Sequence, residues 1–115
     1  MGDPKQARAD HDLALSLRES IANADPTDAD AAYDLASSHL NLSILAWAEN
    51  EPKRIELCLT RARPLADKLW RDHPDNRNYA NLLGLVLNDQ SVLAISRDEH
   101  AEAAALLEKG LEIWR

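Results

Sequence analysis

The fold of this chain is decided by residues 25–51, DPTDADAAYDLASSHLNLSILAWAENE, because their pattern returns 48 residues later in residues 73–99, HPDNRNYANLLGLVLNDQSVLAISRDE. The two segments align without a gap. The aligned pairs include Leu35 with Leu83, Ser43 with Ser91, Ala46 with Ala94, Glu51 with Glu99 and, further on, Leu59 with Leu107. A fixed period held over most of a chain is typical of repeat architectures, in which each unit covers the apolar face of its neighbour.

The composition favours helices. Apolar residues make up 45 % of the 115 residues, and Leu and Ala, both good helix formers, supply most of them. Phe is absent, and there are only three glycines. A chain of this length is expected to form one domain, residues 1–115.

Apolar residues recur at steps of three and four, which predicts amphipathic helices. Pro26 and Pro74 separate successive helices, with Thr27 or Asp28 as the cap of the helix that follows Pro26. The expected helices cover about residues 4–23, 28–48, 52–71, 77–96 and 99–114. The helix 28–48 carries apolar residues on two faces, as expected of an inner helix packed on both sides, and the helix 77–96 is the most apolar of the five.

Two sets of residues share one spacing, in which a small residue is followed 12 positions later by an apolar residue, then by others at steps of four and three. The sets are Leu42-Ser43 with Ile55, Leu59 and Ala62, and Gln90-Ser91 with Ala103, Leu107 and Gly110. This spacing resembles the tetratricopeptide repeat, a helix–turn–helix unit. The usual turn glycine is replaced by Asn50 and Asp98, and the usual aromatic residue by Ala46 and Ala94.

The period of 48 residues exceeds the usual one of about 34 by one heptad per helix. The chain therefore resembles a long-helix tetratricopeptide variant, like those appended to bacterial signalling proteins such as serine/threonine kinases. The resemblance implies an all-α, antiparallel helix-hairpin solenoid of five helices, or about two and a half repeats. It also implies a piece cut from a longer protein. The alternative is a small protein whose ends are covered by self-association.

In such an array the helices 28–48 and 77–96 would line a concave side that accepts a helix or an extended peptide. The residues expected to face it are Ser37, Leu40, Ile44, Trp47 and Ala48, with Leu85, Asn88, Val92, Ile95 and Ser96 as their counterparts. Trp47 would be the anchor. Packing of these apolar residues against neighbouring helices is the alternative. Cations that could grip a carboxylate, as in chaperone-binding members of the family, are missing from these positions.

The sequence predicts a non-catalytic scaffold that binds a protein or peptide, with self-association as the alternative and an enzyme as the third class. No nucleophile–base set, phosphate loop or metal motif occurs, so neither a cofactor, a metal nor a small-molecule substrate is expected. The formal charge of −7 argues against nucleic acid. No apolar run is long enough to span a membrane, and the cytoplasm is the expected location.

Three other features are expected to be structural. His39 stands where its counterpart is Leu87, which indicates a core or half-core histidine. Cys58 is expected to be a small core residue. The third helix is locally basic, which indicates a solvated outer face partly paired with acids of adjacent helices, or alternatively a patch for an acidic partner.

Overall fold

The computed structural model describes the backbone of residues 4–113 and the side chains of residues 12–113. It contains five helices, and the described residues form no strand. The helices are α1 (Pro4–Ala24), α2 (Ala29–Ala48), α3 (Pro52–Asp72), α4 (Arg77–Ser96) and α5 (His100–Ile113). The prediction of an all-helical chain is confirmed for the described residues, and the helix ends that lie among them are within one residue of those expected. The expected end of the fifth helix, residue 114, lies outside the described residues. No helix within the described part of the chain has the length and apolar character needed to cross a membrane.

A side chain caps the N-terminus of each of the inner helices, α2 and α4. The Asp28 carboxylate accepts a hydrogen bond from the backbone N–H of Ala31 at 3.1 Å. The Asn76 side-chain oxygen accepts from the N–H groups of Asn78 at 2.9 Å and Tyr79 at 3.2 Å. Each cap satisfies donors that the first helical turn leaves without a partner. Of the two residues predicted to cap α2, Asp28 is the one that does so.

Both inner helices end in the same tight turn. Asn50 and Asp98, 48 residues apart, have positive φ angles of 55° and 59°. Asn and Asp tolerate this left-handed conformation better than other non-glycine residues do. The next N–H reaches back across the turn, from Glu51 to the carbonyl of Ala46 and from Glu99 to that of Ala94, each at 2.9 Å. Both turns therefore close a Schellman motif and reverse the chain into an antiparallel helix.

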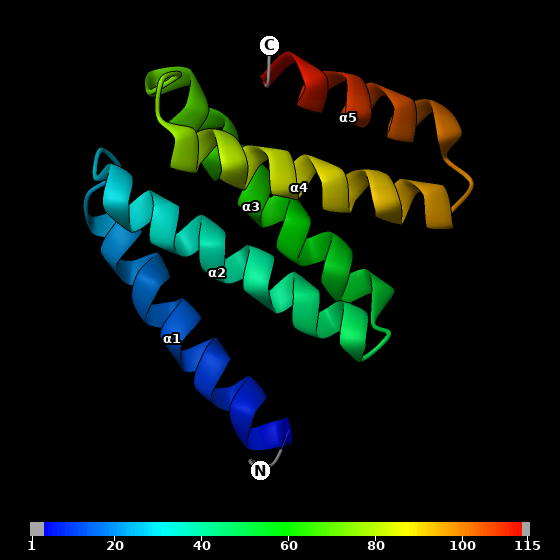
Figure 1. The fold of residues 1–115 in the computed structure, drawn as a ribbon. Helices are drawn as coiled ribbons and strands as arrows, with labels where there is room; N and C mark the ends of the chain where they lie inside the picture. The colour runs from blue at the N-terminus through cyan, green and yellow to red at the C-terminus, as the bar shows by residue number, and fades with distance from the viewer. Residues whose placement is uncertain (1–3, 114–115) are drawn as a thin grey trace.

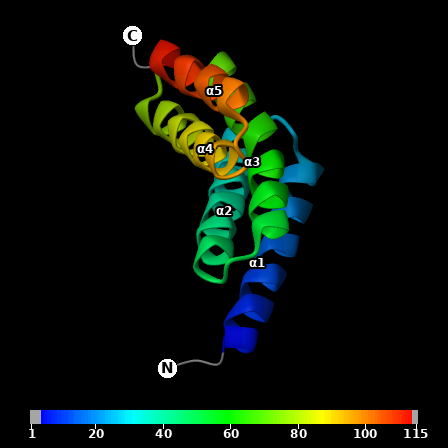
Figure 2. The same cartoon turned by 90° about the vertical axis from the view of Figure 1, so that its right-hand side faces the viewer.

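The five helices form two layers. α2 and α4 lie in one layer, and α1, α3 and α5 lie in the other (Figure 2). Each helix packs against the next one in the chain, and α2 also contacts α4. The molecule measures 40 × 36 × 22 Å, and its thin dimension corresponds to two helices, each about 10 Å across.

The core lies where α2, α3 and α4 meet. Its most completely buried large side chains include Ile55 and Leu59 of α3 and Leu83 and Leu87 of α4. Ser43 and Ser91 are also buried, and each hydroxyl donates to a carbonyl three residues earlier in its own helix. These small side chains let neighbouring helices approach closely while their polar groups stay satisfied.

Candidate interaction surface

The outer face of the α2–α4 layer carries exposed apolar side chains at matching positions of two neighbouring helices. This layer faces the viewer in Figure 1. The exposed fractions are 55 % for Ile44 and 36 % for Trp47 of α2, and 44 % for Val92 and 49 % for Ile95 of α4. Leu85 of α4 is exposed as well. α2 contacts α4, and we call these exposed residues of the two helices the α2–α4 face.

One predicted member of this surface belongs to the core instead. Leu40 is only 7 % exposed and is part of the cluster that contains Leu83 and Val86. α4 packs beside α2 and covers this position. The counterpart of Leu40 is Asn88, which is exposed because no described helix packs on the far side of α4. Leu40 is therefore unavailable to a partner, and its assignment to the open surface is wrong.

The polar residues predicted for this surface differ in how they are placed. Ser37 is half-buried, whereas Asn88, Ser96 and the small Ala48 are exposed. The Ser96 hydroxyl donates to the carbonyl of Leu93 at 2.6 Å. Its proton is thus engaged within α4, and it offers a partner chiefly an acceptor oxygen.

The charged side chains of these two helices are mainly acidic. α2 contains no Lys or Arg, and α4 contains only Arg77. Asp30 and Asp34 lie on the same side of α2 as Ile44 but about 15–20 Å nearer the start of the helix, and Asp89 of α4 is half-buried. Burial raises the pKa of Asp89, although a hydrogen bond from Asn88 acts in the opposite direction. The α2–α4 face therefore combines aliphatic groups with carboxylates, a combination that suits an amphipathic segment bearing cations.

The basic residues gather on the opposite layer. Arg54 of α3 pairs with Asp12 of α1 at 3.2 Å. Arg63 pairs with Asp67 at 3.1 Å and donates to the side chain of Gln90 at 2.8 Å. The Arg54 pair joins α3 to an acid of an adjacent helix, as predicted for a solvated basic face, whereas the Arg63 ion pair lies within α3.

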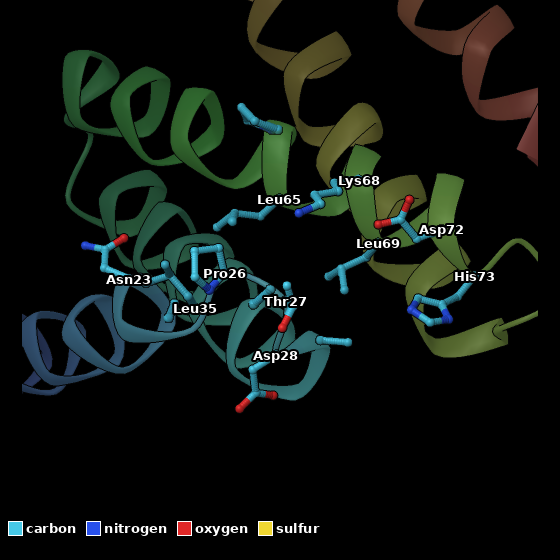
Figure 3. A pocket seen from close by; sticks show the side chains of 14 residues that line it. Asn23, Pro26, Thr27, Asp28, Leu35, Leu65, Lys68, Leu69, Asp72 and His73 are labelled. Carbon is cyan, nitrogen blue, oxygen red and sulfur yellow. The ribbon is translucent and has the colours of Figure 1, made fainter.

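A cavity that the sequence did not reveal lies where α1, α2 and α3 meet. It has a volume of about 420 Å³. Ala22 of α1, Ala32 and Leu35 of α2, and Leu65 and Leu69 of α3 line it (Figure 3). The polar side chains at its edge include Lys68, Asp72 and His73. The cavity cannot be recognised from the sequence, because it depends on how three helices pack together. The sequence signal that was available is the set of alanines at its wall.

His39 and Cys58 are both buried, as predicted. Burial lowers the pKa of His39, while the Glu19 carboxylate, 3.9 Å from its Nε2, raises it and Arg61 lowers it. Burial also raises the pKa of the Cys58 thiol. Within residues whose side chains are described, no three His, Cys, Asp or Glu side chains lie close enough to hold a metal ion.

Comparison with known proteins leaves the family open. The sequence matches no protein-family model, and no curated protein or solved structure is similar enough to count as a match. The resemblance to the tetratricopeptide repeat therefore rests on the spacing of the residues quoted above.

Proposed function

We propose that this chain is a non-catalytic, tetratricopeptide-like scaffold that binds a protein segment on the α2–α4 face. The observation that carries the proposal is the exposure of Ile44 and Trp47 on α2 and of their counterparts Val92 and Ile95 on α4, a helix that α2 contacts. Apolar side chains that gather on one exposed surface commonly mark interaction sites, because their burial against a partner removes them from water. The two-layer packing and the paired turns support a solenoid of repeated helix hairpins.

The preferred segment is amphipathic, with aliphatic residues on one side and Lys or Arg beside them. Its apolar side would cover Ile44 and Ile95, and its cations would lie near Asp34 and Asp89. Charge complementarity of this kind steers encounter and fixes the register of a bound peptide. Trp47 offers the largest apolar surface for an anchor.

Selection from a random displayed peptide library tests this proposal. We expect the enriched peptides to be amphipathic and basic. The double variant Ile44→Asp and Ile95→Asp should weaken their binding by about tenfold or more, because it places two carboxylates where apolar contact forms.

The matched control is Leu57→Asp, an equally exposed apolar residue on α3 in the opposite layer. This variant should bind the selected peptides as the wild type does. Undiminished binding by the double variant, or enrichment of peptides that bind only through Leu57, would count against the α2–α4 face.

Self-association is a second candidate function, favoured by the exposed apolar side chains at the two ends of the described chain. Leu107 of α5 is 47 % exposed, whereas its counterpart Leu59 in α3 is 1 % exposed beneath α4. Leu13, Leu17 and Ile21 form a similar exposed row on α1. Sedimentation velocity at micromolar concentration tests self-association. This function requires a dimer or larger species, which Leu107→Asp should convert to a monomer.

A further inference from the structure

The cavity between α1, α2 and α3 has alanines on two of its sides. Ala22 closes one side from α1, and Ala29 and Ala32 line the α2 side. Leu35 and Leu69 are buried at its walls. Its volume of about 420 Å³ falls in the range of roughly 300–1,000 Å³ that is usual for small-molecule pockets.

The packing of α3 against α4, the equivalent helices of the next repeat, shows which side chains stand at the corresponding positions. Forty-eight residues after Ala22, which lines the cavity, stands Trp70, whereas the counterpart of the lining residue Ala32 is Ala80. Trp70 packs against the same cluster as Leu83, the counterpart of Leu35. A large aromatic side chain therefore packs at the α3 position whose counterpart in α1 is the alanine at the cavity wall.

The turns that precede α2 and α4 have the same structure. Asp28 and Asn76 cap equivalent helices, and in each turn the cap N–H bonds to the carbonyl three residues earlier. With these turns alike and alanine standing in α1 where α3 has Trp70, the α1–α2 packing lacks the large side chain that packs where α3 meets α4. Empty apolar space next to a core is unfavourable because its lining loses dispersion contacts.

We propose that this cavity binds a small, uncharged aromatic molecule with a ring system the size of indole or naphthalene. Such a ring would contact Leu35, Leu65 and Leu69 much as Trp70 contacts its own cluster. This ligand site is distinct from the α2–α4 face and goes beyond the scaffold function proposed for that face.

The side chains at the edge of the cavity favour an aromatic ligand rather than an aliphatic one. The Lys68 side chain lies at the edge beside Leu65 (Figure 3). An ammonium group over a ring face is attracted by the ring's quadrupole, and a saturated ring offers no such attraction. The edge also carries the Asp28 and Asp72 carboxylates, so its charges are mixed and favour an uncharged ligand.

Titration with indole, followed in amide proton–nitrogen correlation spectra, tests the proposal. We expect saturable shifts confined to residues 22–35 and 64–73. Cyclohexylmethanol, an aliphatic probe without a π face, should bind several-fold more weakly. Ala22→Trp should abolish the indole shifts, because the new side chain would occupy the cavity as Trp70 occupies the equivalent place.

Ala24→Trp is the matched control, since Ala24 is exposed at the end of the same helix and does not line the cavity. It should bind indole as the wild type does. If circular dichroism shows that Ala22→Trp is unfolded, Ala32→Leu fills the cavity from the α2 side and should also abolish binding. The proposal is overturned if indole gives no saturable shifts, if the shifts lie on the α2–α4 face, or if a folded filled variant still binds.

Discussion

Residues 48 positions apart can perform the same structural task with different chemistry. Asn50 and Asp98 both adopt the left-handed conformation that ends an inner helix. His39 and Leu87 are both buried, yet only His39 can carry a proton. A charged imidazole in this place would lose hydration, and burial accordingly lowers its pKa in spite of the opposing effect of the Glu19 carboxylate.

His39 makes stability depend on pH. The unfolded chain binds a proton at His39 near the ordinary pKa of 6.5, whereas the folded chain binds it only at lower pH. Between these values the unfolded state holds more protons, so the free energy of unfolding falls as the pH is lowered. We expect urea unfolding midpoints to decrease from about pH 7.5 to about pH 5.5.

The substitution His39→Leu, which installs the counterpart residue, should remove most of this dependence. His100→Leu is the control, because it makes the same exchange at an exposed histidine and leaves the buried position unchanged. A profile of His39→Leu that parallels the wild type would show that another group controls the response.

At the scale of the element, α3 tolerates an interior proline because one whole face of this helix is packed against neighbouring helices. Ile55, Leu59 and Ala66 belong to its buried row, which contacts α2 on one side and α4 on the other. Pro64 lies inside the helix but is exposed. It lacks the N–H that the carbonyl of Thr60 would otherwise accept.

Replacing Pro64 by alanine should therefore stabilise the protein by about 1–2 kcal/mol, because the helix gains a hydrogen bond while the unfolded chain gains some freedom. Thermal and urea unfolding measure the change. Pro52→Ala is the matched control, since Pro52 begins α3 where no N–H is required, and it should give little or no gain. Equal effects of the two substitutions would contradict the argument.

At the scale of the whole molecule, burial is uneven along the stack. α3 and α4 lie between other helices and carry most of the core, whereas the described side chains of α1 include only one buried residue, Ala22. α1 packs mainly on α2, and its contacts with α3 are few: Asp12 pairs with Arg54, and Leu65 packs beside the cluster that contains Ala22. In a stacked array each element is stabilised mainly by its immediate neighbours, so an outer helix opens at lower cost.

Amide hydrogen exchange should follow this gradient. We expect the amides of α1 to exchange at least about tenfold faster than those of α3 and α4, because local opening of α1 exposes little apolar surface. Mass spectrometry of peptides produced after exchange resolves the helices separately. Protection of α1 equal to that of α3 would mean that the stack opens only as a unit.

Most of the candidate surface was predictable, and its exception has a clear cause. Helical spacing alone placed Ile44, Trp47, Val92 and Ile95 on common faces of two helices. Whether such residues are open or covered depends on what lies beside the helix. Leu40 and Asn88 occupy equivalent positions, but α4 covers the first and no described helix covers the second.

The sequence by itself determined the number and the approximate ends of the helices, since these depend on where prolines and turn residues stand within a few positions. It left the cap of α2 open between Thr27 and Asp28, and the structure shows Asp28 and Asn76 as the capping residues. The tertiary structure alone decided which apolar residues are exposed and that a cavity lies behind Ala22. Those properties depend on how three separate helices pack against one another. The spacing of residues within one helix does not specify the distances between helices.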